Sequence, residues 1–183
     1  MKVIETKFSN AFLLEPKVFG DHRGFFMESY NDQAFKELGF DYEFVQDNHS
    51  LSVEVGTLRG LHYQLEPYAQ TKLVRVVRGA IYDVIVDIRK GSPTYGEWQG
   101  FILSEWNKWQ LLVPKGFAHG FCTIVPNTEV LYKVDNYYSP KHDRGIYWND
   151  PDLKIDWPTH SPILSEKDSK HPRLVEVENN FTY

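Results

Sequence analysis

The chain has 183 residues, of which 42% are hydrophobic and 25% are charged, and its formal net charge is -5. This length and balance are typical of a globular protein that builds its own core, and we expect one domain over residues 1–183. The negative charge excludes a general attraction to nucleic acid or to an anionic membrane. Any phosphate that the protein binds must therefore be held by a local cluster of arginine and lysine.

Cellular location is predicted from the cysteine content and from the amino-terminal residues. Cys122 is the single cysteine, which excludes an internal disulfide and a cysteine-based zinc site. It follows Phe121, and we expect a buried, unreactive thiol. The first seven residues lack the apolar core of a signal peptide, and no apolar run reaches membrane-spanning length. We therefore expect a cytoplasmic protein.

Turn residues divide the chain into short segments. Asn31 can cap a helix over 32–38, and Gly39 can end it. Segments rich in Val, Ile, Phe and Tyr follow, and they predict strands over 71–77, 80–88, 99–104, 110–113 and 129–134. Many short strands at this spacing favour a sandwich or a barrel over βαβ units. Residues 141–183 are rich in proline and charge and are predicted to form a wrapping tail with some helix.

The stretch Leu58–Gln64 carries the most informative residues of the chain. A neutral histidine such as His62 is a competent general base near neutral pH, and a neighbouring arginine can hold an anion. Arg59 and His62 have opposite parity, so a regular strand would place them on opposite faces. A bulge at Gly60 would bring both side chains to one face, because glycine tolerates bulge geometry.

Three further strand-like segments carry polar residues that are candidates for the same site. Lys72 shares a strand face with Val74, and Tyr132 is a possible phenolic acid. Asp83 and Asp87 have two open interpretations: buried partners for a cation or a histidine, or solvent-facing charges at a sheet edge.

Metal binding would require three or four protein ligands. Gln64 stands two residues after His62, where a second histidine would be needed, and Thr123 stands four residues after His119. Glu66 is the remaining candidate ligand, but it precedes Pro67 in an apparent turn. We therefore expect no metal site.

Taken together, these motifs resemble the dTDP-4-dehydrorhamnose 3,5-epimerase family of cupin-like β-barrel proteins. The resemblance runs from residue 14 to residue 168, nearly the whole chain. It is carried by the segments 19–26 (FGDHRGFF), 44–50 (FVQDNHS), 58–62 (LRGLH), 70–75 (QTKLVR), 113–121 (VPKGFAHGF), 132–133 (YK), 136–140 (NYYSP) and 148–150 (WND). A single segment of this kind would be weak evidence, whereas the ordered set is specific.

The resemblance implies an all-β, cupin-like jelly-roll barrel with a few short helices, and a homodimer. It also implies epimerisation of a 4-keto-6-deoxy sugar carried on dTDP, at C3 and C5, in dTDP-L-rhamnose biosynthesis, with no metal and no redox cofactor. By this resemblance His62 is the base and Asp168 orients it. Lys72 stabilises the enolate oxygen with His119 beside it, and Tyr132 delivers a proton from the opposite face.

The resemblance also implies the substrate-binding residues. Those that hold the nucleotide and the diphosphate are Arg23, Glu28, Gln46, Asn48 and Arg59. Tyr138 stacks on thymine, and Phe25, Asp143 and Lys167 complete the set. Asp143 departs from the family pattern, in which a glutamate is common at this position. Two alternatives remain open at this point: a 3- or 5-monoepimerase of a related dTDP-keto-sugar pathway, and a noncatalytic ligand-binding cupin.

Overall fold

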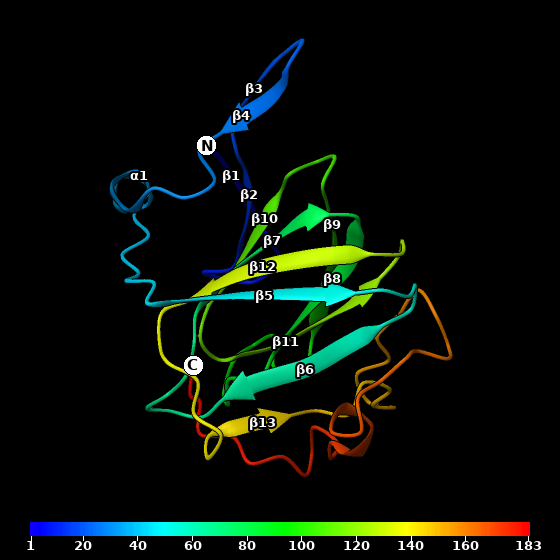
Figure 1. Ribbon diagram of the computed structural model, residues 1–183. Helices are drawn as coiled ribbons and strands as arrows, with labels where there is room; N and C mark the ends of the chain where they lie inside the picture. Colours follow the sequence, from blue (N-terminus) through cyan, green and yellow to red (C-terminus); the bar gives the residue numbers. More distant parts are fainter.

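The computed structural model describes residues 1–183, and its architecture is two facing antiparallel sheets (Figure 1). One sheet has the strand order β1 (Lys2–Glu5), β2 (Phe12–Glu15), β10 (Gln110–Val113), β7 (Lys72–Arg78), β12 (Thr128–Val134) and β5 (Gln46–Ser52). The other has the order β13 (Asp143–Gly145), β6 (Leu58–Gln64), β11 (Phe117–Thr123), β8 (Ala80–Asp87) and β9 (Trp98–Ser104). This arrangement confirms the expected all-β class.

Strand alternation sends one face of each sheet into the space between them. Val74 and Val130 of the six-stranded sheet meet Ile85, Phe117 and Phe121 of the five-stranded sheet in one buried apolar cluster. The same inward faces continue into polar side chains. Lys72 precedes Val74 by two positions on β7, and His119 lies between the two phenylalanines on β11. The sandwich is therefore apolar in one part and polar in another, and the polar part holds the cavity described below.

The carboxy-terminal segment covers the outer face of the five-stranded sheet. Trp157, Leu174 and Phe181 of this segment pack with Leu61 and Val86 in a second buried cluster. Its single helical element is the 3-10 turn η1 (Asp168–Lys170). The predicted wrapping tail is confirmed, except that strand β13 at its start joins the five-stranded sheet, and the tail places Asp168 beside strand β6.

The helix α1 (Asp32–Glu37) forms where the sequence predicts it, and it ends one residue earlier than expected. The Asn31 side chain accepts a hydrogen bond from the amide of Ala34 at 3.1 Å, which is a normal N-cap. Phe35 buries its ring against Leu73 and Leu112 on the outer face of the six-stranded sheet. No helix in the structure is both long enough and apolar enough to cross a membrane.

The predicted strands agree with β7, β8, β9, β10 and β12 to within one residue at each end. Strand β11 was absent from these predictions. Its outward positions carry Ala118, Gly120 and Cys122, which weaken the sequence pattern of a strand. Gly120 is required by a close approach, because a Cβ there would lie 2.8 Å from the carbonyl oxygen of Arg59 on β6. Small residues at a tight strand contact explain the weak signal.

A separate hairpin, formed by β3 (Val18–Asp21) and β4 (Gly24–Met27), projects away from the two sheets (Figure 1). Its aromatic side chains are unusually open to solvent: Phe19 is 53% exposed, Phe25 58% and Phe26 70%. An exposed aromatic patch of this kind marks an interaction surface.

Candidate active site

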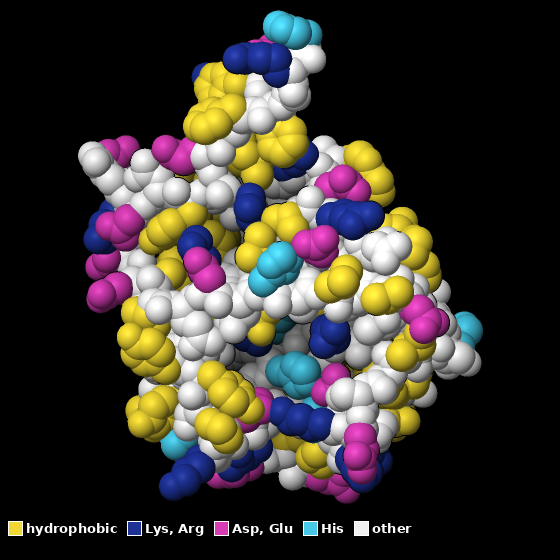
Figure 2. Space-filling view, in the orientation of Figure 1, with side chains coloured by type: hydrophobic (Ala, Val, Ile, Leu, Met, Phe, Trp, Pro, Cys, Tyr) yellow, Lys and Arg dark blue, Asp and Glu magenta, His cyan; other side chains and the backbone are white.

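A cavity of about 410 Å³ opens between the sheets and is lined by charged and polar side chains. Figure 2 shows the hollow on this face of the molecule, with basic, acidic and histidine side chains gathered in it. The sequence-predicted residues that line it are Arg59, His62, Lys72, His119, Tyr132, Lys167 and Asp168. Long-range strand pairing and the packing of the carboxy-terminal segment have therefore brought seven residues from five separate segments to one site.

The expected bulge at Gly60 is confirmed. His119 pairs with His62 and Phe121 pairs with Arg59, so three steps along β6 oppose two steps along β11. Gly60 has a φ of 133°, a conformation that side chains other than glycine rarely adopt. The bulge places Arg59 and His62 on the same cavity wall, which a regular strand would not do.

His62 is held by Asp168 across more than one hundred residues of sequence. Its Nε2 lies 2.6 Å from Asp168 Oδ1, and Asp168 is buried in the turn η1. The Ser165 hydroxyl accepts a hydrogen bond from the Asp168 amide at 3.0 Å and fixes the turn. Because Nε2 is engaged, Nδ1 is the ring nitrogen left for a substrate proton.

The protonation states of this pair suit a base with an ionised partner. Burial lowers the pKa of His62 below its ordinary 6.5, although the hydrogen bond and charge of Asp168 act to raise it. Burial by itself would raise the pKa of Asp168, but contacts with His171 and His62 outweigh it and hold that pKa well below its usual range. Near neutral pH the imidazole is therefore neutral and the carboxylate is charged.

His119 forms a second histidine–carboxylate pair directly across the strand from His62. Its Nε2 lies 2.6 Å from Asp83 Oδ1, and both side chains are buried. The open question about the two aspartates of β8 is thereby answered. Asp83 is a buried partner for a histidine, whereas Asp87 binds the guanidinium of Arg89 at 2.7 Å.

Lys72 and Tyr132 line the cavity from the six-stranded sheet. Burial lowers the pKa of Lys72 to about 8, and the charges of Asp143 and Asp83 act to raise it. At neutral pH the side chain remains mainly an ammonium in a poorly solvated position. Burial raises the pKa of Tyr132, so its phenol keeps its proton. The wall thus offers a cation and a neutral acid.

A second cavity of about 320 Å³ adjoins the first and shares His62, Lys72, Tyr132 and Lys167 with it. The predicted substrate-binding residues found there are Gln46, Asn48, Tyr138 and Asp143. Gln46 and Asn48 share the inward face of β5 and join through a side-chain hydrogen bond of 2.9 Å. Asp143 accepts a hydrogen bond from the Tyr138 hydroxyl at 3.0 Å and forms an ion pair with Lys167. These residues form the outer part of the site.

Three predicted substrate-binding residues do not line either cavity. Arg23 and Phe25 belong to the projecting hairpin, where Arg23 is bound to Asp21 beside it. Glu28 follows the hairpin and accepts a hydrogen bond from Asn31 at 3.0 Å. Within one copy of the chain, these three side chains stand apart from His62.

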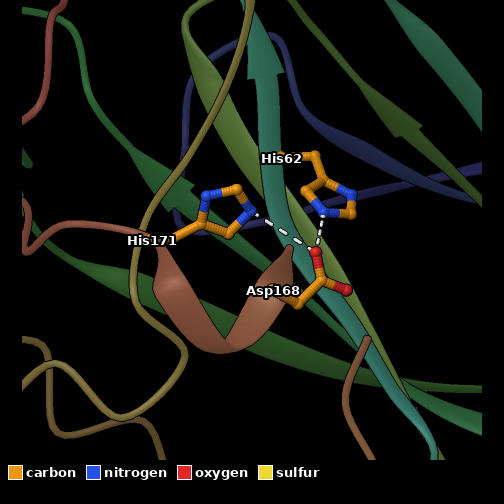
Figure 3. Close-up of side chains that lie close together, drawn as sticks. All are labelled: His62, Asp168 and His171. Carbon is orange, nitrogen blue, oxygen red and sulfur yellow. Dashed lines mark hydrogen bonds and ion pairs between the residues drawn. The ribbon is translucent and has the colours of Figure 1, made fainter. Parts of the chain in front are cut away.

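One residue at the site was missed from the sequence. His171 lies beside His62 and contacts the same carboxylate: its Nε2 lies 3.4 Å from Asp168 Oδ1 (Figure 3). The available signal was its spacing of three residues from Asp168, which brings two side chains together in a helical turn.

His62, Asp168 and His171 offer three ligand atoms within 4.8 Å of one another, so a metal ion must be considered. A four-coordinate zinc ion with bonds near 2.1 Å separates its ligand atoms by roughly 3.4 Å. The His62–Asp168 contact of 2.6 Å is shorter than that and suits a shared proton. As they stand, these residues do not fit a metal centre.

Comparisons with known proteins identify the family of this chain. The family model described as dTDP-4-dehydrorhamnose 3,5-epimerase matches residues 5–176. The chain is 55% identical to a dTDP-4-dehydrorhamnose 3,5-epimerase of Shigella flexneri, over 97% of this chain and 98% of that protein. Two solved structures each superpose with a TM-score of 0.92.

The first of these structures is a dTDP-4-dehydrorhamnose 3,5-epimerase of Bacillus anthracis with TDP and PPi bound. It is 63% identical, over 94% of this chain and 98% of that one. The second, from Legionella pneumophila, is a dTDP-6-deoxy-D-glucose-3,5-epimerase in complex with dTDP-4-keto-L-rhamnose. It is 46% identical, over 97% of this chain and 94% of that one. The cupin-like fold expected from the motifs is thereby confirmed, and the chain belongs to the dTDP-4-dehydrorhamnose 3,5-epimerase family.

Proposed function

We propose that this epimerase of dTDP-L-rhamnose biosynthesis inverts C3 and C5 of its dTDP-4-keto-6-deoxy sugar with His62 as the base and Tyr132 as the acid. A ketone at C4 acidifies the hydrogens on both neighbouring carbons. Removal of either proton gives an enolate, and return of a proton to the opposite face inverts the carbon. The reaction therefore requires a base, a group that holds the enolate oxygen, and an acid on the far side.

The observation that carries this proposal is the placement of His62 and Tyr132 on different sheets around one cavity. His62 lines it from β6 of the five-stranded sheet, and Tyr132 lines it from β12 of the six-stranded sheet. A sugar ring held between the sheets would present one face to each side chain. The neutral imidazole and the protonated phenol described above are the forms that the two roles need.

Lys72 and His119 are proposed to hold the enolate oxygen. Lys72 is a compact ammonium in a poorly solvated position, where its attraction for a developing negative charge is strong. The contact between His119 Nε2 and Asp83 fixes the orientation of the imidazole, and therefore the direction in which its other ring nitrogen, Nδ1, points. Both residues line the same cavity as His62.

The nucleotide part of the substrate is proposed to extend from Arg59 in the first cavity into the second cavity. The guanidinium of Arg59 suits a bidentate contact with the diphosphate. Tyr138 is more than half exposed, so its ring is open to stacking on thymine, and Lys167 and Asp143 lie beside it. The TDP and dTDP-keto sugar held by the two solved relatives support a nucleotide-sugar substrate for this chain.

The projecting hairpin is proposed to complete the site of a second copy in a homodimer. Its aromatic rings are exposed in one copy, and Arg23 and Phe25 lie away from the cavity. If the hairpin packs on a partner, the rings become buried and Arg23 can reach the partner's bound diphosphate. Glu28 would join the same contact.

A cytoplasmic location belongs to this proposal too, and cell fractionation tests it.

Incubation of dTDP-4-keto-6-deoxyglucose with the enzyme in deuterated water tests the proposed reaction. We expect deuterium at both C3 and C5, with inversion at both carbons by NMR. Folded His62→Ala protein should lose about 10²–10⁴-fold in turnover, the usual contribution of a general base. Exchange at one carbon alone would identify a monoepimerase, and near-normal turnover in the variant would exclude His62 as the base.

A further inference from the structure

Asp168 is shared by two histidines. The same carboxylate oxygen, Oδ1, lies 2.6 Å from His62 Nε2 and 3.4 Å from His171 Nε2. Figure 3 shows both rings reaching the same oxygen of the carboxylate; His62 comes from strand β6 and His171 is the residue that follows η1. The rings meet edge to face, with their centroids 5.6 Å apart. The arrangement is a triad of His62, Asp168 and His171, in which both imidazoles contact one carboxylate oxygen.

His171 is largely buried, and its Nε2 has no polar partner other than Asp168. Its side chain is 9% exposed, and its Nε2 makes no hydrogen bond. A buried ring nitrogen is normally paired, because leaving it unpaired costs free energy. Asp168 Oδ1 is the polar atom within reach of this nitrogen, so the contact accounts for the orientation of the ring.

Gly145 on β13 leaves the space that the His171 ring occupies. Gly145 pairs with His62 across the sheet, and a Cβ at position 145 would lie 2.3 Å from His171 Nε2. Any larger residue would displace the imidazole from the carboxylate. Strand β13, which pairs with the strand of His62, therefore carries a glycine at the position where the His171 ring packs.

We propose that His171 is a positioning residue that directs an N–H toward Asp168 and thereby keeps His62 less basic than a simple histidine–aspartate pair would. This inference rests on the proposed role of His62. An N–H of His171 that points at Asp168 stabilises the negative charge of the carboxylate, whether His171 is neutral or protonated. Less of that charge then stabilises the His62 imidazolium, so the base stays neutral and active at lower pH.

Other charged and titratable groups also act on His62, and the test must separate them from His171. Those that share its cavities are Arg59, Tyr63, Lys72, His119, Tyr132, Tyr138, Asp143, Lys167 and Asp168. The groups around His171, which line a cavity of about 400 Å³ with it, are Asp143, Arg144, Lys167, Lys170 and Glu178. A substitution confined to His171 leaves all of them in place.

The test compares His171→Gln with His171→Met. Gln places an N–H donor near the position of the histidine Nε2, and Met has a similar length without a donor. In the Met variant we expect the acid limb of kcat/KM, and the pKa of His62 measured by NMR from its ring proton, to rise by about 0.5–1 unit. The Gln variant should stay near wild type. His160→Met, at an exposed position, controls for the substitution itself, and Gly145→Ala should reproduce the Met result by displacing the ring.

Each outcome decides the question. An unchanged pKa of His62 in a folded His171→Met protein overturns the proposal, as does an equal shift in the Gln and Met variants. A raised pKa of His62 in the Met variant alone supports it. If that pKa rises while the kinetic acid limb stays in place, the role of His171 stands and the assignment of His62 as the base fails. Thermal unfolding of each variant establishes that it is folded.

Discussion

His62 and His119 occupy directly paired positions on neighbouring antiparallel strands, and each imidazole is held through Nε2 by its own carboxylate at 2.6 Å. Their surroundings differ: the His62 side chain is 33% exposed in the cavity, whereas that of His119 is 7% exposed. An accessible ring can exchange protons with a substrate, and a buried, fixed ring suits a hydrogen bond of constant direction. The His62–Asp168 pair can therefore transfer protons, whereas the His119–Asp83 pair can hold a substrate atom by a hydrogen bond of fixed direction.

The first prediction separates the roles of Lys72 and Arg59. Lys72→Ala should lower kcat by roughly 10²–10³-fold, comparable to the loss of an oxyanion donor. Arg59→Ala should mainly raise KM, because a diphosphate contact contributes to binding in the ground state and the transition state alike. Steady-state kinetics of both variants measure this. The opposite pattern would show that the two roles are exchanged.

The second prediction concerns Tyr132→Phe, which keeps the ring and removes only the phenolic proton. His62 and Lys72 can still form the enolate, so hydrogen exchange with deuterated water should continue. Inversion should fall much more than exchange, particularly at C5. Mass spectrometry counts the deuterium and NMR reports the configuration. An equal decline of the two would exclude Tyr132 as the selective acid.

The third prediction is a bell-shaped dependence of kcat/KM on pH. Activity should fall on the acid side below the ordinary histidine pKa of 6.5, since burial lowers the pKa of His62 and protonation destroys the base. It should fall on the alkaline side near the Lys72 pKa of about 8, where the ammonium is lost. Tyr132 cannot cause that loss, because its pKa is raised.

Lys72→Arg provides the control for the alkaline side. An arginine stays charged above pH 12, so the alkaline limb should disappear even if the rate is lower throughout. Measurements from about pH 5 to about pH 10 cover both limbs. Persistence of the alkaline limb at the same pH in the arginine variant would assign it to another group.

The fourth prediction tests whether the hairpin serves a partner subunit. A mixture of His62→Ala and Arg23→Ala chains, dissociated and reassembled, should regain activity that neither has alone. A mixed dimer then holds one site with an intact His62 from one chain and an intact Arg23 from the other. Sedimentation analysis checks that dimers are present. If Arg23 serves its own chain, mixing restores nothing.

Local features of this protein follow from the sequence. Asn31, the residues after it and Gly39 predict α1 because capping and helix propensity act within a few residues. Val at every second position predicts β7, and alternating Val and Tyr predict β12, because strand burial has a period of two. The opposite parity of Arg59 and His62 required a bulge, and glycine at position 60 located it, as the structure confirms.

The position of the hairpin away from the site and the partners of the two histidines were decided by tertiary structure. Asp83 was recognised as a candidate partner, but its pairing with His119 depends on the register of β8 against β11. His171 escaped notice because it contacts Asp168 only after the carboxy-terminal segment packs beside β6 and Gly145 leaves space for the ring. Sequence patterns describe each strand and turn, whereas contacts between residues distant in the chain depend on which strands pair and in what register.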